Sequence, residues 1–194
     1  KSALQAMGYD ENVFKVMLVQ FVSLKRGEQK VSMSTRSGEF ETLADVIKEV
    51  GVDATRFFFL MRSSDTHLDF DLELAKKASA DNPVFYIQYA HARICSIFRT
   101  ATERGIKLLD WVDIDLSPLK NEEEFVMIKK ILSFAEIIEK SAELLEVHRV
   151  AFYLQDLVGT FHSYYSRNRI VSDDHALSFA RLFLMNCLRI TICN

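Results

Sequence analysis

The clearest structural signal in this chain is an Asn-Pro pair at Asn82 and Pro83. Asparagine accepts hydrogen bonds from the free backbone amides at a helix start, and proline fits the first turn because its missing N–H needs no partner there. No glycine or proline follows until Gly105. The pair therefore predicts a helix from position 83 to about 105. It also places a domain boundary just before that helix, in the loop-like region from Lys76 to Asp81.

The C-terminal part of the chain is predicted to be a helical bundle. Two prolines and six glycines in 194 residues favour a mainly α fold. One further helix is predicted after Ser117 to Lys120, another from about Arg149 to Asn168, and a last one from His175 to the end, capped by Ser172 and Asp173. In the first of these, apolar residues recur at three- and four-residue steps and are expected to face the core; they are Phe125, Ile128, Leu132 and Ala135.

The N-terminal part, residues 1–78, is predicted to be a small α+β unit. Residues from Met17 to Leu24 are rich in valine and phenylalanine, a turn signal follows at positions 26–28, and positions 29–33 continue the pattern of a β-hairpin. Thr42 is expected to cap a helix that Gly51 ends, and Asp53 to cap the next helix. The acidic stretch at positions 63–73 is interpreted as an exposed connector into a helix over positions 72–80.

Charge and spacing exclude several classes of site. The three cysteines and five histidines lack the paired short spacings of a zinc site or a disulfide framework, so we expect no metal and a reducing, cytoplasmic location. No apolar run approaches the roughly 20 residues that cross a bilayer, so no membrane contact is expected. The net charge is -3, yet four basic residues crowd one short segment, which allows RNA binding; they are Lys25, Arg26, Lys30 and Arg36.

Three strings of residues resemble the arginyl-tRNA synthetase family. The string VSMSTRSGEF at Val31–Phe40 is similar to the second signature loop of class I aminoacyl-tRNA synthetases, usually written KMSKS. The strings NPVFYIQYAHARI at Asn82–Ile94 and FHSYYSRNRI at Phe161–Ile170 are similar to helices of the anticodon-binding domain of the arginyl enzymes. They occur in the family's order, and the similarity runs along essentially the whole chain.

The resemblance implies a domain organisation and a function. Residues 1–78 correspond to the end of the catalytic domain, with the KMSKS-like loop at 31–38, and residues 79–194 to a DALR-type anticodon-binding domain truncated at its C-terminus. The parent enzyme uses ATP with Mg to activate arginine and transfers it to tRNA(Arg). Its implied partners are tRNA(Arg) and the remainder of the catalytic domain, and the parent is expected to be monomeric. Apolar residues close to Asn194 and a first residue other than methionine also lead us to expect a fragment.

The resemblance also implies a limited catalytic role for the signature loop. Ser32 stands at the motif's first lysine, Met33 and Ser34 agree with it, and Thr35 replaces the second lysine, with Arg36 after it. Ser34 is the candidate phosphate-facing group, and Lys30 and Arg36 are near enough to supply the missing charge. The first class I signature has no counterpart among the five histidines. We therefore expect the fragment alone to be inactive and to bind no cofactor, and the loop to be poorly ordered without the missing domain.

A binding face is predicted on the helix that begins at Pro83. On a helical wheel, a core stripe containing Ile87 and Ile94 lies beside a separate arc of about 60°; the arc holds Asn82, Tyr86, Tyr89 and Arg93. Tyrosines and an arginine at this spacing can stack an unpaired base and hold a phosphate. On the later helix, Tyr165 and Arg169 are further candidates for tRNA binding, whereas His162 is expected to be a structural hydrogen-bonding group.

Three alternatives stay open at this stage. The tyrosines also suit half-buried packing against a neighbouring helix, the interpretation that their spacing favours without the family resemblance. The whole chain could then be a helical protein-interaction domain without an RNA role, in which Val31 to Phe40 is only a surface hairpin. Within the synthetases, the cysteinyl enzymes use a related helical domain. Steep weakening of binding by salt distinguishes an RNA-binding surface from an apolar protein interface.

Overall fold

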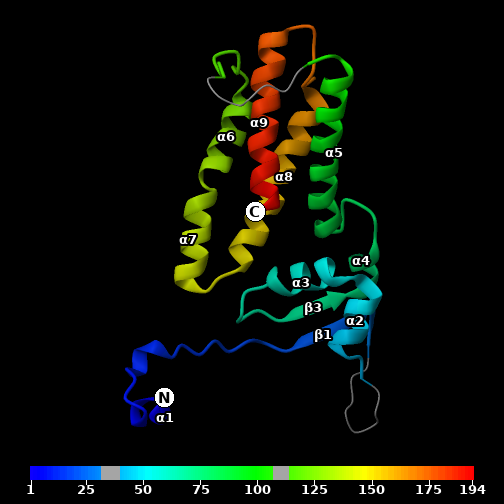
Figure 1. Cartoon of the computed structure of the whole chain (residues 1–194). Coiled ribbons are helices and arrows are strands. Elements are labelled where there is room, and N and C mark those ends of the chain that lie inside the picture. Colours follow the sequence, from blue (N-terminus) through cyan, green and yellow to red (C-terminus); the bar gives the residue numbers. More distant parts are fainter. Residues whose placement is uncertain (32–39, 107–113) are drawn as a thin grey trace.

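The computed structural model describes residues 1–31, 40–106 and 114–194. It contains a small α/β unit at one end of a long helical bundle (Figure 1). Ahead of the unit lie α1 (Ser2–Ala6), a short 3-10 helix (Glu11–Val13) and an extended arm whose apolar side chains are exposed. The predicted mainly α fold is confirmed.

The small sheet has three strands in the order β2-β1-β3. Strand β1 (Val22–Arg26) pairs antiparallel with β2 (Gln29–Lys30), as the predicted hairpin requires, and parallel with β3 (Leu68–Asp71). The predicted first strand is therefore too long, since it starts at Val22 rather than at Met17.

The interpretation of positions 63–73 as an exposed connector was wrong, because that segment contains β3. Leu68 and Phe70 are buried, while Asp69 between them is exposed. This alternation is the signature of a half-buried strand, and the surrounding acidic residues concealed it.

Three helices cover the sheet and enclose the smaller core. Helix α2 (Leu43–Val50) starts with the predicted cap, since the Asp45 amide donates to Thr42 Oγ1 at 3.2 Å. Gly51, with φ of 88°, ends α2 and also caps α3 (Val52–Leu60) in place of the predicted Asp53. Helix α4 (Leu72–Lys76) is shorter than predicted. The smaller core between these elements includes Leu24, Phe58 and Phe70.

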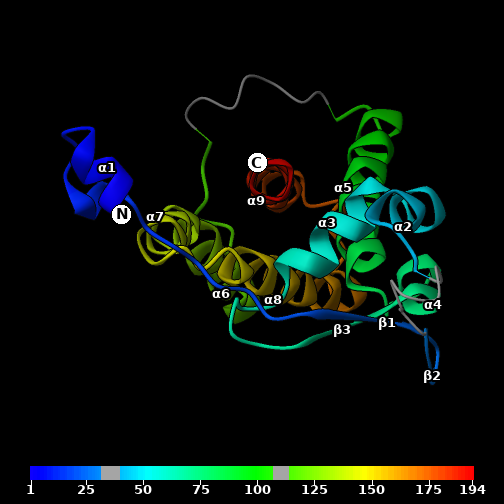
Figure 2. The same ribbon diagram turned by 90° about the horizontal axis from the view of Figure 1, so that it is seen from below.

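Within the part of the chain that the structure describes, five helices form the bundle. They are α5 (Pro83–Glu103), α6 (Glu122–Leu132), α7 (Phe134–Leu144), α8 (His148–Arg167) and α9 (His175–Cys193). Figure 2 shows α5, α8 and α7 in a curved row, with α9 against its concave side. By length and composition α9 could cross a membrane, and 44% of its apolar window is buried inside this bundle. Its Leu182, Met185 and Leu188 lie fully in the larger core.

Two predictions about the bundle were wrong. The expected apolar stripe after Lys120 faces the core only at Ile128: Phe125 is 49% and Leu132 75% exposed, and the helix ends at Ser133, where α7 begins. The fully buried positions of α6 are Glu124 and Met127 instead. A polarity pattern cannot anticipate a buried carboxylate, because charged residues are ordinarily outside. At the start of α9, the capping side chain is Asp174 rather than Ser172 or Asp173.

Candidate nucleic-acid interface

Asn82 is a structural residue rather than part of an exposed surface. Its side chain is 4% exposed, and its Oδ1 accepts from the amides of Val84 at 3.1 Å and Phe85 at 3.5 Å. Its Nδ2 donates to the carbonyls of Ala75 at 2.9 Å and Lys77 at 3.0 Å. Asn82 thus caps α5 and ties it to α4. The prediction that this side chain contacts tRNA is corrected, because the fold already uses both ends of its amide.

The remaining predicted residues of α5 meet α8 in one cluster, here called the aromatic–arginine face. It consists of Tyr86, Tyr89 and Arg93 from α5 with His162 and Tyr165 from α8. The Arg93 guanidinium lies 4.4 Å from the Tyr89 ring centre and 5.1 Å from the Tyr165 ring centre. Such distances are within the range of cation–π attraction. The two helices therefore place one positive charge between two aromatic rings.

His162 joins the two helices by hydrogen bonds. Its Nε2–H donates to the Tyr86 carbonyl at 3.2 Å, and its Nδ1 accepts from Arg93 Nη1 at 3.1 Å. Only the neutral ring, with its proton on Nε2, satisfies both partners, since arginine has no acceptor. Burial and the neighbouring Arg93 charge lower the pKa of His162, which keeps the ring neutral. The structure agrees with the structural role predicted for His162.

The residues of the aromatic–arginine face differ in how exposed they are. Tyr89 is 43% exposed, whereas Tyr86 is half-buried with its ring 4.4 Å from that of His162. The flank-packing alternative therefore describes Tyr86 well and Tyr89 only in part, because the Tyr89 ring lies 5.9 Å from that of Phe85 and 5.8 Å from that of His162 while much of the residue stays exposed. Arg93 and Tyr165 are also half-buried. What the face presents to a ligand is the Tyr89 ring beside a fixed guanidinium.

A surface pocket of about 300 Å³ adjoins the face at Tyr165. Its walls come from α5, from the end of α8 and from the segment after α8, and they include Ser96, Thr100, Arg104 and Arg169. Arg104 Nη1 donates to the Val171 carbonyl at 3.4 Å, while Arg169 is exposed. The predicted residues Tyr165 and Arg169 thus lie on one pocket wall, which extends the basic and aromatic surface along α5.

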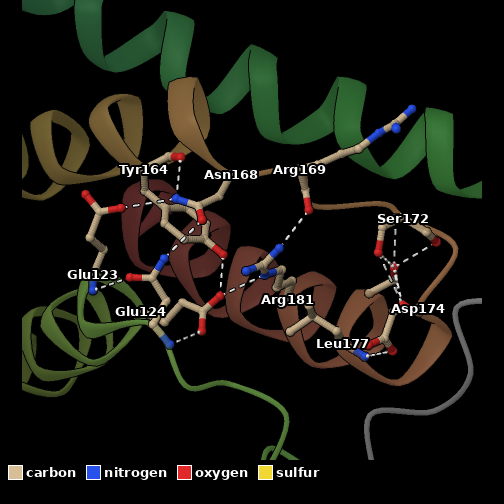
Figure 3. Close-up of polar contacts among 11 residues, drawn as sticks. Glu123, Glu124, Tyr164, Asn168, Arg169, Ser172, Asp174, Leu177 and Arg181 are labelled. Atoms are coloured by element: carbon tan, nitrogen blue, oxygen red, sulfur yellow. Dashed lines mark hydrogen bonds and ion pairs between the residues drawn. The ribbon is translucent and has the colours of Figure 1, made fainter.

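The interpretation from sequence missed a polar network beneath this pocket (Figure 3). Glu124 of α6 is completely buried, and its Oε1 accepts from Tyr164 Oη at 2.6 Å and from Arg181 Nε at 2.7 Å. Burial by itself raises the carboxyl pKa, but the bonds from Tyr164, Arg181 and the Asn121 amide outweigh burial and hold the pKa of Glu124 below its usual value. One signal in the sequence could have indicated a role for Glu124: the N-x-x-E spacing of Asn121 and Glu124, which forms a capping box at the start of α6.

The signature-loop candidates cannot be assembled into a site. The structure does not describe five of these candidates, which are Ser32, Met33, Ser34, Thr35 and Arg36. The prediction that this loop is poorly ordered also falls on residues outside the described ranges. Lys30, at the end of β2, is exposed. Nearby positive charge is partly neutralised, since Arg26 pairs with Glu41 at 2.9 Å and Glu49 at 2.5 Å. The bonds from Arg26 and Lys76 lower the pKa of Glu49 to about 2.

Comparisons with known proteins agree with this architecture. The family model described as the DALR anticodon binding domain matches residues 87–194. The chain is 50% identical over its whole length to an arginine–tRNA ligase of Syntrophotalea carbinolica and 53% identical to one of a Geobacter species. It spans about 35% of the length of either relative.

Solved structures show the same relation. A putative arginyl-tRNA synthetase from Campylobacter jejuni superposes with a TM-score of 0.84 at 31% identity, covering 98% of this chain and 40% of that one. The arginyl-tRNA synthetase of Thermus thermophilus gives 0.63 at 26% identity, with coverage of 81% and 26%. Fold and surface define a helical module with an aromatic and basic face. The chain belongs to the family of DALR anticodon-binding domains.

Proposed function

We propose that this chain is the tRNA-binding part of an arginine–tRNA ligase. The aromatic–arginine face is the observation that carries the proposal, because it lies on the domain matched by the anticodon-binding family. The 50% identity to arginine–tRNA ligases over the whole chain supports arginine rather than cysteine as the amino acid. In the proposed parent protein, arginine is activated with ATP and Mg and transferred to tRNA(Arg) in the cytoplasm, and the parent acts as a monomer.

The face suits an unpaired RNA loop in two respects. A partly exposed aromatic ring such as that of Tyr89 can accept the flat surface of any base, and stacking contributes about 1–3 kcal/mol per base. The guanidinium of Arg93 keeps free N–H groups beyond its bond to His162, so it can reach a phosphate or a base edge. Tyr165 and Arg169 continue the surface, so that a strand leaving Tyr89 meets a second cation on the pocket wall. Tyr89 therefore supplies stacking, and the two arginines supply charge.

Across the ranges 1–31, 40–106 and 114–194, no group of three or more His, Cys, Asp or Glu side chains could hold a metal ion. Lys30 stands exposed at a strand end. We propose that ATP chemistry belongs to the longer parent, since the chain spans about 35% of the length of its relatives, and that the remainder of the catalytic domain is the partner of residues 1–78. The roles of Ser34, Lys30 and Arg36 belong to that proposal.

Direct binding measurements test the proposed function. We expect labelled tRNA(Arg) to bind the purified 194-residue chain more tightly than tRNA(Cys) does. The logarithm of the affinity should fall linearly with the logarithm of salt concentration, by about 0.7 per single-strand phosphate contacted. Equal affinity for both tRNAs contradicts the arginyl assignment. Absence of salt-sensitive RNA binding favours the helical protein-interaction domain.

A further inference from the structure

The link between α8 and α9 is anchored from inside the bundle by the polar network of Figure 3. Arg181 of α9 uses two different edges of its guanidinium. Its Nε donates to the buried Glu124 carboxylate, and its Nη1 donates to the backbone carbonyl of Arg169 at 2.8 Å. Arg169 lies in the irregular segment that follows the end of α8. One side chain thus joins α6 and α9 to the link.

A second pair of bonds fixes the residue before Arg169. Asn168 Nδ2 donates to Glu123 Oε2 at 3.1 Å, and its Oδ1 accepts from Asn121 Nδ2 at 3.0 Å. Further along, the Ser172 amide donates to Ser178 Oγ at 2.9 Å. These contacts come from both ends of the link. The Arg181 bond is the one that pins the carbonyl of Arg169 itself.

The side chain of Arg169 points the other way. Figure 3 shows it extending from the network towards α5, where it lines the same pocket as Tyr165. Among the residues described, its guanidinium has no hydrogen-bond or ion-pair partner. A free, exposed arginine ordinarily loses considerable side-chain entropy when it binds a ligand. When the backbone of Arg169 is held in place, the guanidinium samples fewer positions before binding, so less entropy is lost when it contacts a ligand.

Stability alone explains this network poorly. Burying a carboxylate and a guanidinium costs desolvation energy, and apolar replacements of such pairs are often as stable or more so. A lysine at this position could neutralise Glu124. Its single ammonium group could not also donate to the Arg169 carbonyl, whereas the planar guanidinium of arginine carries N–H groups that point in different directions. The geometry requires arginine because a single side chain must serve both partners.

We propose that Arg181 is a positioning residue: anchored by Glu124 and Tyr164, it holds the Arg169 backbone so that the Arg169 guanidinium contacts a phosphate of the bound tRNA. This inference rests on the proposed function. It assigns a role in RNA binding to a side chain that is largely buried and touches no RNA.

The test replaces Glu124 and Arg181 together, so that an effect on the position of Arg169 can be distinguished from a loss of folding. In the double variant Glu124→Gln/Arg181→Met, the glutamine can still accept from Tyr164, and no unpaired charge is left inside. The bond to the Arg169 carbonyl is lost. Arg181→Lys is the conservative variant, and Arg189→Met is the matched control. Arg189 lies on the same helix but contacts Asn186 and the Phe98 ring rather than the link.

The first readout needs no RNA. By amide hydrogen exchange, positions 169–171 should exchange faster in the double variant and in Arg181→Lys, but not in Arg189→Met. The melting temperature should stay close to that of the wild type in the double variant. Unchanged exchange across the link in the folded double variant overturns the positioning role, whether or not the chain binds tRNA.

The second readout is the salt dependence of tRNA(Arg) affinity. One lost single-strand phosphate contact lowers the slope by about 0.7, which is about fivefold in affinity between 1 M and 0.1 M salt. We expect this loss in Arg169→Ala and in the double variant, with no further loss when all three changes are combined. Additive losses, or wild-type slope in the double variant, overturn the inference. If wild-type chain binds no tRNA(Arg), the proposed function fails and the RNA role of Arg181 fails with it, while exchange still reports the anchor.

Discussion

Arg93 is held in place before any ligand arrives, because two tyrosine rings flank its guanidinium and His162 accepts one of its N–H groups. A group fixed in this way loses little freedom on binding, so more of its interaction energy appears as affinity. Tyr89 contributes differently. It is 43% exposed, although its ring also lies near the rings of Phe85 and His162, and the exposed part becomes buried only when a base stacks on it.

Replacing Tyr89 with alanine should separate these two roles. We expect Tyr89→Ala to lose about 1–3 kcal/mol of tRNA binding energy, the usual value of one base–aromatic stack. The melting temperature should change little, because nearly half of the side chain is already exposed. Phe125→Ala, at a similarly exposed aromatic on α6, is the control and should leave affinity unchanged. Equal losses in both variants contradict a specific stack at Tyr89.

His162 should make the stability of the chain depend on pH. Its folded-state pKa is lowered by burial and by Arg93, so the unfolded chain takes up the proton more readily. The stability it contributes is fully present above the unfolded pKa of about 6.5 and is lost as the pH falls through that value towards the lower folded pKa. The glutamine of His162→Gln can keep both hydrogen bonds but cannot titrate.

Melting temperatures at pH 7.5 and pH 5.5 measure this effect. The decrease on acidification should be larger in the wild type than in His162→Gln. Titration of the other four histidines is common to both proteins and cancels in the comparison. An equal or larger decrease in the variant contradicts the assignment of a lowered pKa to His162.

Among the elements, α5 depends most clearly on a single capping residue. Asn82→Ala removes two accepted and two donated hydrogen bonds at the start of the helix. We expect a loss of about 2 kcal/mol, or on the order of 5 °C in melting temperature for a chain of this size. Asn82→Asp keeps the acceptor and should lose less. Since Asn82 is buried, tRNA affinity of the folded variants should match the wild type, and a selective loss of affinity restores Asn82 to the binding surface.

The sequence predicted a helix end correctly wherever one or two neighbouring residues determine that end. Thr42 and Asn82 mark helix starts with their side-chain oxygens, Pro83 and Gly51 mark helix ends by their backbone, and the structure confirms these ends. Strand β3 was missed because the strand it pairs with is distant in the sequence, with Ser23 lying opposite Asp69, 46 residues later, and because its polar positions are acidic. Glu124 was missed because its burial depends on Tyr164 and Arg181, which only tertiary packing brings together.

The candidate face was predictable for a similar reason. Tyr86, Tyr89 and Arg93 share one helix, so their spacing alone brings them together. The contributions of His162 and Tyr165 depend on how α5 crosses α8, and the spacing of residues within one helix does not specify that crossing. The anchoring of Arg169 by Arg181 involves three elements and was beyond any local pattern.

At the scale of the whole molecule, Phe57 connects the two cores. Its half-buried ring packs against both the smaller α/β core and the larger bundle core, and α3 contacts α5 and α8. The two parts should therefore unfold together only while this side chain joins them. Phe59, on the same helix and also half-buried, packs against the smaller core and provides a matched control.

We expect Phe57→Ala to divide the single calorimetric transition of the wild type into two. The α/β unit should melt first, destabilised by about 2–3 kcal/mol, because truncating a buried phenylalanine costs 3–5 kcal/mol and this ring is only half-buried. Phe59→Ala should lower the melting temperature while keeping one transition, since the contact between the cores remains. Circular dichroism at each plateau identifies which part has unfolded, as the bundle holds the longest helices. One cooperative transition in Phe57→Ala, shifted as far as in Phe59→Ala, shows that the two parts are joined by contacts other than Phe57.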